Sequence, residues 1–186
     1  SDLINADGIS IVWAARLFGH SIPERVTGID LMQQLVALSH LKSYKCFFLG
    51  ANENVVKKVV KNYSKKYSND IIAGYRNGYY NESDELEIVN QIKESNANIL
   101  FVAMTSPKKE IFLNKYKKEL SNINFIMGVG GSFDVISGTL KRAPKFIQNL
   151  GFEWLYRFIQ EPRRMWKRYL IGNFKFIMLI ISRQKC

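Results

Sequence analysis

The chain has 186 residues, of which 47% are hydrophobic and 13% aromatic, a composition typical of a folded globular protein with one substantial core. Its two cysteines, Cys46 and Cys186, are too few for a disulfide framework or a cysteine-based metal site. No segment reaches the roughly 18 apolar residues of a membrane-spanning helix, and no signal peptide is visible, so we expect a cytoplasmic protein.

The net charge of +11 is unevenly placed along the chain. From Lys141 onward there are eleven Lys or Arg residues against two acids, so this last quarter carries +9 of the total. The same segment is rich in aromatic residues. A basic, aromatic segment predicts an anionic partner, namely nucleic acid, an acidic membrane or a phosphorylated substrate.

The first predicted element is a helix over residues 9–19, "ISIVWAARLFG", in which apolar residues recur at helical spacing and Gly19 marks the end. Its remaining faces are nearly as apolar, which predicts a helix buried on most sides. A turn follows around "IPERVTGID", and "LMQQLVALSHLK" predicts a second helix over residues 31–42.

Strands and helices alternate in the next hundred residues. The apolar runs at 44–51, 70–75, 98–104 and 124–131 predict strands, and the segments at 52–67, 84–95 and 106–120 predict helices between them. This alternation is typical of βαβ units with right-handed crossovers. We therefore predict a Rossmann-like α/β layer, with a mainly parallel sheet covered by helices on both faces.

After Ala143-Pro144 the strand pattern ends, and the rest of the chain has helical periodicity, broken around Gly151, Glu161-Pro162 and Gly172. This helical section coincides with the basic, aromatic quarter. The sequence thus predicts a Rossmann-like domain over residues 1–144 and a basic helical appendage over residues 145–186.

Three predicted strand ends carry residues suited to ligand binding, because ligands of open α/β sheets bind at the carboxyl ends of the strands. Gly50 precedes a helix, Ser106 and Pro107 are suited to the N-cap and first position of another, and "GVGGSFDVISG" contains three glycines. Each of these segments is equally compatible with an ordinary tight turn. None matches a P-loop or a dinucleotide-binding fingerprint, which argues against a P-loop NTPase.

No metal site is predicted. His20 and His40 are isolated in the sequence, and no Asp-x-Asp pair is present to hold a metal–diphosphate complex. A bound diphosphate would therefore be neutralised by Arg, Lys and helix termini. Arg157, Arg164 and Arg168 fall on one helical face if the helix continues past Pro162, although this face is equally compatible with a solvated basic surface.

Asp7 is a lone carboxylate at the start of an apolar segment, and two interpretations fit it. Aspartate is among the best N-cap residues, so Asp7 is suited to cap the first helix. A carboxylate beside a basic wall is also suited to act as a general base that takes a proton from a hydroxyl nucleophile. The two roles are compatible, because a capping carboxylate keeps one oxygen available.

Five blocks of the sequence stand out when taken together: "ADGISIVWAARLFG…PERVTGIDL", "FFLGA", "SPKKE", "GVGGSFDVISGTLKRAP" and "EWLYRFIQEPRRMWKRYL". In order and spacing, these blocks resemble the WecG/TagA/CpsF family of bacterial glycosyltransferases. The resemblance implies transfer of a sugar, typically N-acetylmannosamine or a related hexose, from a UDP-sugar donor to a sugar on undecaprenyl diphosphate. It further implies inversion at the anomeric carbon, no metal and no cofactor, and products that enter capsule or cell-wall polysaccharides.

The resemblance also implies roles for individual residues. Asp7 matches the proposed base of the family's Asp-Gly, so catalysis becomes its expected role, with capping as a second. Arg25 matches an arginine thought to stabilise the diphosphate leaving group. The nucleotide-binding segment is expected at Gly128, Gly130, Gly131 and Asp134. Arg157 and Arg164 match arginines of an appendage that closes over the active site and docks on the membrane.

The sequence departs from the family in two places. Most members have Gln in "PKQE", where this chain has Lys109, a substrate-binding candidate whose cation can alter how donor or acceptor is held. The family also has several tens of residues before the Asp-Gly, so the resemblance implies that the N-terminal part of the family domain is missing here.

The expected partners are therefore a UDP-sugar, a lipid-linked acceptor and the anionic inner face of the plasma membrane, where the chain would be peripheral. The aromatic residues of the appendage could instead pack on the sheet or form a homo-oligomer contact. Two other functions stay open: a catalytically inactive relative that acts as a partner subunit, and a basic nucleic-acid-binding module. The absence of a nucleic-acid-binding motif argues against the last, so we expect no nucleic-acid partner.

Overall fold

The computed structural model describes residues 9–20, 26–163, 165–166, 171–172, 178 and 182. The chain divides into two compact units, one of residues 26–139, here called the sheet unit, and a second unit of residues 1–25 and 140–186. The predicted division into a catalytic domain and an appendage after residue 144 stays a prediction. Its boundary lies close to the junction of the two units, but the N-terminal 25 residues group with the C-terminal segment.

The sheet unit alternates strands and helices, as the sequence predicts. Its elements are α2 (Gly28–Lys42), β1 (Cys46–Gly50), α3 (Glu53–Lys66), η1 (Asn69–Ile71), β2 (Ile72–Arg76), η2 (Glu82–Asp84), α4 (Glu85–Glu94), β3 (Ile99–Ala103), α5 (Lys108–Lys115), β4 (Phe125–Gly128) and α6 (Ser132–Ile136).

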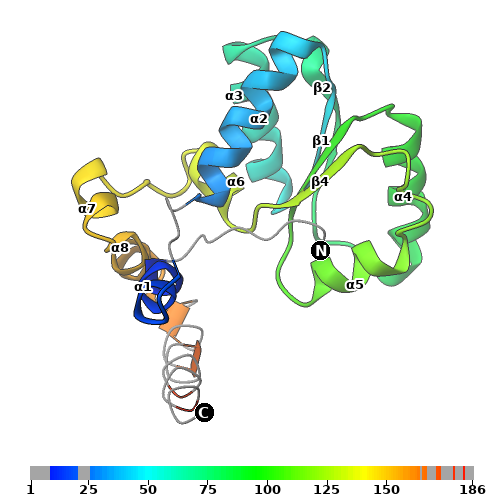
Figure 1. Ribbon diagram of the computed structural model, residues 1–186. Coiled ribbons are helices and arrows are strands. Elements are labelled where there is room, and N and C mark those ends of the chain that lie inside the picture. Colours follow the sequence, from blue (N-terminus) through cyan, green and yellow to red (C-terminus); the bar gives the residue numbers. More distant parts are fainter. Residues whose placement is uncertain are drawn as a thin grey trace. The chain divides into compact units, whose positions relative to one another are not determined.

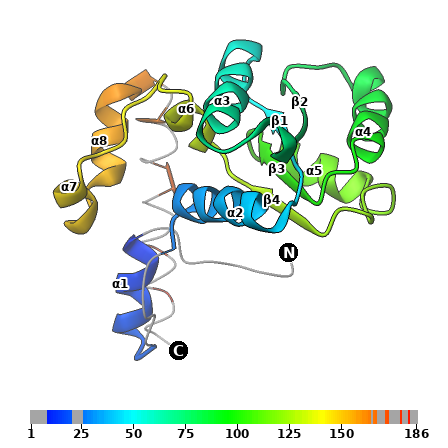
Figure 2. The same ribbon diagram turned by 90° about the horizontal axis from the view of Figure 1, so that it is seen from above.

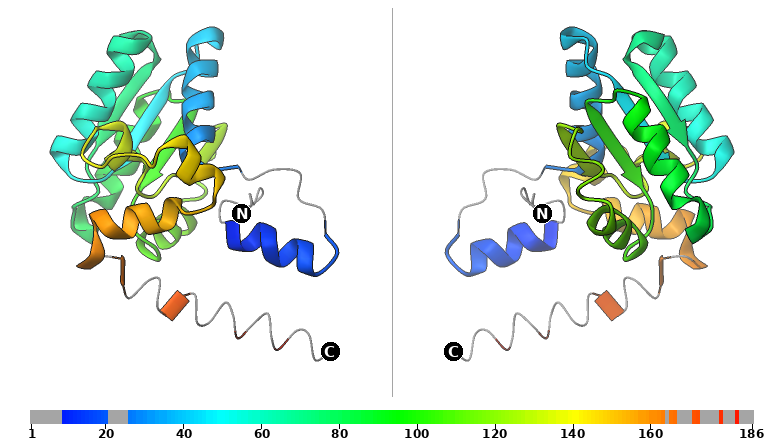
Figure 3. Two further views of the ribbon diagram at one scale, coloured as in Figure 1. Left: turned by 90° about the vertical axis from the view of Figure 1, so that its left-hand side faces the viewer. Right: turned by 90° about the vertical axis from the view of Figure 1, so that its right-hand side faces the viewer.

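The four strands form a parallel sheet in the order β2-β1-β3-β4. Helices α2, α3 and α6 pack on one face, and α4 and α5 pack on the other (Figure 1 and Figure 2). The opposite views in Figure 3 show the sheet behind each helical layer in turn. The predicted Rossmann-like α/β fold is thus confirmed. Because β1 and β3 are neighbours whose following helices lie on opposite faces, the sheet has its topological switch point between them.

The core explains why the strands could be recognised. Every residue of β1, "CFFLG", and of β3, "ILFVA", is buried, because helices cover both faces of a parallel sheet. Phe48 and Phe101 point toward α2 and α3, and their rings stack with centroids 5.6 Å apart. Leu49 and Leu100 point toward α4 and α5. Cys46 lies fully buried in this core.

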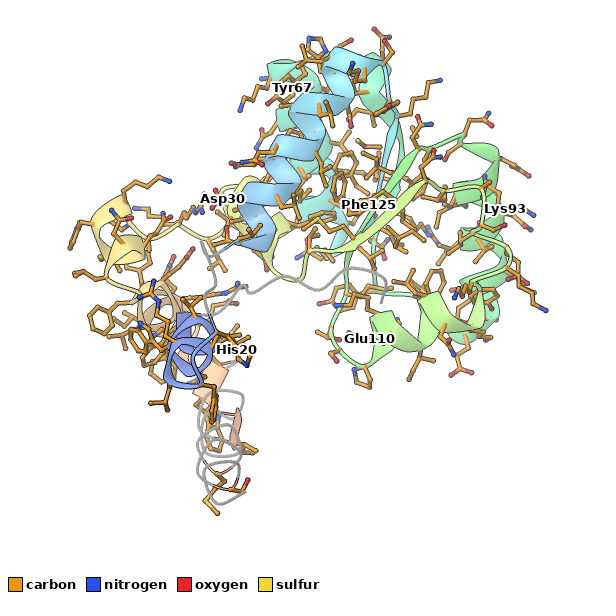
Figure 4. All side chains as sticks on the ribbon, viewed as in Figure 1. His20, Asp30, Tyr67, Lys93, Glu110 and Phe125 are labelled. Atoms are coloured by element: carbon orange, nitrogen blue, oxygen red, sulfur yellow. The ribbon has the colours of Figure 1, made fainter. Side chains whose placement is uncertain are left out.

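Side-chain caps fix the starts of two helices. The Asn52 side-chain oxygen accepts a hydrogen bond of 2.9 Å from the Val55 N–H at the start of α3. Thr27 caps α2, because its hydroxyl accepts from the Asp30 N–H at 3.3 Å and donates to the Asp30 carboxylate at 2.6 Å. This cap makes α2 begin at Gly28, three residues before the start that the sequence predicts. Figure 4 marks Asp30 at this end of α2.

One prediction for the later part of the sheet unit is wrong. Ser106 and Pro107 form a turn, and α5 starts at Lys108 with Pro107 in the cap position, so Ser106 is not the N-cap. The segment 132–136, for which the sequence predicts no element, forms the short helix α6. The buried Phe133 packs this helix against the core.

The second unit contains α1 (Ile9–Leu17), α7 (Lys145–Asn149) and α8 (Glu153–Gln160). The predicted breaks at Gly151 and Glu161 are confirmed, whereas Gly172 is itself helical. The prediction that the first helix is buried on most sides is wrong: Trp13 is 55% and Leu17 is 61% exposed, while Val12 is buried. Apolar composition favours burial, but it does not supply neighbours to cover the helix.

Polar contacts link the ends of this unit's segments. The Lys141 N–H donates to the Gln160 side chain at 2.9 Å, and the same side chain donates back to the Lys141 carbonyl at 2.9 Å. Arg142 lies 3.8 Å from the Glu153 carboxylate. Among the helices that the structure describes, none has the length and apolar character to cross a bilayer.

Candidate substrate-binding site at the carboxyl ends of the strands

The end of β1 is packed tightly against β3. Gly50 has a φ of +126°, and a Cβ at this position would lie 2.4 Å from the Ala103 carbonyl oxygen. The next residue, Ala51, donates its N–H to the same oxygen at 2.9 Å. Glycine is therefore required at position 50 by the neighbouring strand itself, which favours the tight-turn interpretation of "FFLGAN".

The loop after β2 lies across the ends of β1 and β3. The Gly78 N–H donates to the Ala51 carbonyl at 2.8 Å, and a Cβ on Gly78 would come within 3.0 Å of the Gly50 Cα. Lys108, at the start of α5, holds this loop in place. Its Nζ donates to the carbonyls of Gly78 at 3.2 Å and Tyr80 at 3.4 Å, and it lies 3.7 Å from the centre of the Tyr80 ring.

Sequence reasoning missed this role of Lys108. The available signal was the pair of lysines in "SPKKE", of which only the second was assigned a role. A cation so close to two carbonyls and an aromatic face is already well coordinated. Lys108 therefore ties α5 to the loop, and its ammonium group has its donors engaged.

Lys109 and Gly128, both predicted as substrate-binding residues, lie against each other. A Cβ on Gly128 would be 2.8 Å from the Lys109 Nζ and 2.9 Å from its Cδ and Cε, so glycine leaves the space that the lysine side chain occupies. The Lys109 Nζ is 3.2 Å from the Glu110 carboxylate, and only 22% of the lysine side chain is exposed. Figure 4 marks Glu110 on α5. The cation thus lies beside the carboxyl end of β4.

The loop after β4 presents open backbone. Gly130 has a φ of +49° and is exposed, with no atom within 4 Å of the position a Cβ would take. Gly131 occupies the cap position of α6, and Asp134 lies partly buried in the first turn of that helix. The loop therefore leaves main-chain groups accessible at the sheet edge, as close approach to a ligand requires. The nucleotide-binding roles of Gly128, Gly130, Gly131 and Asp134 stay predictions.

A further polar cluster at the ends of β1 and β2 was not predicted. The Glu53 carboxylate accepts a hydrogen bond from the Asn77 side chain at 2.8 Å and lies 3.1 Å from the Lys57 Nζ. These contacts, the Asn77 hydrogen bond first, hold the pKa of Glu53 below its usual range. Arg76, the last residue of β2, lies close enough to contribute to this lowering.

In the second unit, Arg157 is the predicted site residue that the structure describes. Its side chain is 27% exposed, and its Nε lies 3.9 Å from the Glu161 carboxylate, too far for a hydrogen bond. Within the part of the chain that the structure describes, this buried Nε has no hydrogen-bond partner. Asp7, Arg25 and Arg164 lie outside the described residues, so their roles stay predictions.

Nothing in the geometry assigns a metal. Within the described ranges, no group of three or more His, Cys, Asp or Glu side chains could hold a metal ion. Metal independence of the reaction stays a prediction.

Comparison with known proteins covers the whole chain. The model of the glycosyl transferase WecG/TagA/CpsF family matches residues 1–186. Two curated relatives, from Bacillus subtilis strain 168 and Bacillus spizizenii, are each 36% identical over 185 residues, which cover 100% of this chain and 70% of each relative. Both are named N-acetylglucosaminyldiphosphoundecaprenol N-acetyl-beta-D-mannosaminyltransferase. This chain therefore belongs to the WecG/TagA/CpsF family of glycosyltransferases.

Proposed function

We propose that this enzyme transfers an N-acetylmannosamine-type sugar, or a related hexose, from a UDP-sugar to a sugar carried on undecaprenyl diphosphate. The observation that carries the proposal is the match of the entire chain, at 36% identity, to two relatives whose names specify such a lipid-linked acceptor and N-acetylmannosamine as the transferred sugar. The product would enter a bacterial surface polysaccharide.

The proposed reaction is a direct displacement that inverts the anomeric centre. The Asp7 carboxylate takes the proton of the acceptor hydroxyl, and the hydroxyl oxygen attacks the anomeric carbon of the donor. The bond between this carbon and the phosphate oxygen breaks, and UDP leaves with the electron pair. Arg25, Arg157 and Arg164 neutralise the charge that develops on the diphosphate, in the role that a divalent cation plays in other transferases.

The sheet unit supplies the donor-binding residues of this proposal. Lys109, held beside Gly128, places a cation at the carboxyl end of β4, where the glycine-rich loop exposes its main chain. A nucleoside diphosphate needs both features, a countercharge for its phosphates and backbone that it can approach closely. Because most members have Gln where this chain has Lys109, this residue is also the proposed source of any difference in donor or acceptor preference.

The second unit supplies the proposed membrane contact. Five apolar residues of α7, α8 and the turn between them are exposed: Phe146, Leu150, Phe152, Leu155 and Ile159. Exposed lysines at positions 141 and 145 lie in the same segment. Apolar side chains beside cations suit a peripheral contact with an anionic bilayer, where the lipid-linked acceptor resides.

A thermal-shift screen of the full chain with UDP, UDP-sugars and short oligonucleotides tests the proposal against its two alternatives. We expect UDP and a UDP-sugar to raise the melting temperature and oligonucleotides to have no effect. A shift with oligonucleotides alone would identify a nucleic-acid-binding module. No shift with any nucleotide would favour an inactive relative that acts as a partner subunit.

A further inference from the structure

The Nε of Arg76 lacks a hydrogen-bond acceptor among the residues that the structure describes. This atom is buried, although the residue as a whole is partly exposed. Leaving a buried donor of a charged group unpaired is unfavourable, because the water it has lost is not replaced. Such groups are rare in native structures, where a bound water or ion commonly satisfies them.

The Glu53 carboxylate, whose pKa the charge of Arg76 helps to lower, is paired with other residues. Glu53 accepts from the Asn77 side chain at 2.8 Å and forms an ion pair with Lys57 at 3.1 Å, so its two oxygens are engaged by these partners. Arg76 influences the Glu53 carboxyl only as a nearby charge. The guanidinium therefore lies beside a satisfied carboxylate and keeps its own donors available.

Arg76 also occupies the edge of the sheet at which a ligand is expected. It is the last residue of β2 and is in register with Leu49, next to the turn at Gly50 where β1 ends. The other cations described at this edge are engaged: Lys108 donates to two carbonyls, and Lys109 pairs with Glu110. Among the described cations of this edge, Arg76 is thus the one best placed to donate hydrogen bonds to an anionic oxygen.

We propose that Arg76 binds a phosphate oxygen of a diphosphate ligand at the carboxyl end of β2. This inference rests on the proposed function, which supplies two sources of a diphosphate, the nucleotide of the donor and the lipid carrier of the acceptor. A guanidinium suits such a ligand, because its fixed, planar donors match phosphate oxygens. We assign the nucleoside diphosphate, because nucleotides usually bind at the carboxyl ends of the strands in this fold class, and Arg76 lies at that edge, one strand away from the switch point between β1 and β3.

Isothermal titration calorimetry with the full chain tests the assignment. The probes are UDP, inorganic diphosphate, geranyl diphosphate and uridine, and the variants are Arg76→Met and Arg76→Lys. Lys61→Met is the matched control, because Lys61 is an exposed cation on α3 of the same unit. We expect Arg76→Met to weaken UDP and inorganic diphosphate by roughly 10- to 100-fold, as loss of a charge-assisted hydrogen bond does. Arg76→Lys should keep part of the affinity, and uridine binding and Lys61→Met should show no change.

The outcomes separate this assignment from the proposed function. Unchanged UDP affinity in Arg76→Met, with tight binding by the wild type, overturns the role of Arg76 and leaves the donor proposal standing. An Arg76-dependent affinity for geranyl diphosphate that exceeds the affinity for UDP overturns the nucleotide assignment. If the wild type binds neither UDP nor inorganic diphosphate, the Arg76 assignment is wrong.

Thermal unfolding of the same variants separates binding from structure. Because the buried Nε has no partner, Arg76→Met should be at least as stable as the wild type. A lower stability in Arg76→Met, restored in Arg76→Lys without any change in affinity, would mark a purely structural residue. If Arg76→Met does not fold, the affinities of Arg76→Lys and Arg76→Gln for UDP and inorganic diphosphate are compared with those of the wild type instead.

Discussion

The two units of this protein differ in the exposure of their large apolar side chains. In the sheet unit, Phe48 and Phe101 are fully buried between the sheet and its helices. In the second unit, Phe146 is 64% and Ile159 is 69% exposed, although the segment is just as rich in large apolar side chains. The sheet unit encloses a core of its own. The second unit leaves large apolar side chains exposed to water, which is unfavourable. This contrast is the basis of the proposal that the second unit contacts a membrane surface, whereas the sheet unit is stable through its own core.

The proposed site residues divide along the same line. Lys109, Arg76 and the glycine-rich loop belong to the sheet unit, whereas Asp7 and the arginines expected to act on the leaving group belong to segments of the second unit. Substitutions in the two units should therefore affect different measurements. The sheet unit should govern the free energy of unfolding, and the second unit should govern turnover and membrane binding.

The largest effect is expected at Asp7. Asp7→Asn removes the proposed base but keeps the size of the side chain and its ability to cap a helix, so turnover should fall about 10²- to 10⁴-fold while the fold is retained. Steady-state UDP release measures the first quantity, and circular dichroism with thermal unfolding measures the second. Near-normal turnover in this variant would remove Asp7 from the mechanism.

A pair of substitutions tests the contrast itself. Phe48→Ala should lower the free energy of unfolding by about 3–5 kcal/mol, because it opens a cavity in the closed core. Ile159→Ala shortens an exposed side chain and should change the free energy of unfolding by less than about 0.5 kcal/mol. Urea unfolding gives both values.

Cosedimentation with anionic vesicles tests the proposed membrane contact of the second unit with a matched pair of variants. Ile159→Glu should release the protein from the vesicles, and Leu86→Glu, at a similarly exposed site of α4 in the sheet unit, is its control. Equal loss of binding in both variants, or none in either, would contradict the assignment of membrane contact to the second unit.

Two glycines with positive φ sharpen the comparison further. Gly50→Ala should destabilise the protein by about 3 kcal/mol, because its Cβ would overlap the Ala103 carbonyl at a φ that alanine rarely adopts. Gly19→Ala, in the second unit, has open space around the new Cβ and should lower stability by about 1 kcal/mol, the cost of a left-handed residue. Similar values for the two would show that the contact between β1 and β3 is looser than described.

The smallest expected effect concerns the pH dependence of stability. Burial raises the pKa of the Cys46 thiol to about 11, whereas in the unfolded chain it stays near the ordinary value of 9.0. The neutral thiol therefore stabilises the fold fully below pH 9, and this contribution is lost as the pH rises toward 11. Between pH 9 and pH 10 unfolding should become easier by about 1 kcal/mol. Cys46→Ala should remove this contribution to the slope and leave that of other buried groups such as Tyr63, whose pKa is also raised by burial. An unchanged slope in this variant would assign the effect to another group.

The sequence predicted most of the sheet unit because its signals are local. Buried strands such as 46–50 and 99–103 form continuous apolar runs, and residues such as Asn52 mark helix starts. What it missed depends on distant residues. Tertiary neighbours determine that the Nε of Arg76 has no acceptor among the described residues and that Lys108 donates to the loop after β2. A single sequence does not reveal such neighbours. The burial of the first helix was predicted wrongly for the same reason, since composition does not show which other elements pack against a helix.

The central claim is that this chain makes a glycosidic bond on a lipid-linked sugar. Incubating the full chain with UDP-N-acetylmannosamine and a short-chain lipid diphosphate carrying N-acetylglucosamine tests it, with the product followed by mass spectrometry and its linkage by NMR. We predict a disaccharide-lipid with a β-linked sugar and one equivalent of UDP. An intact donor and acceptor, or a product in which the donor sugar is transferred to water alone, would contradict the account.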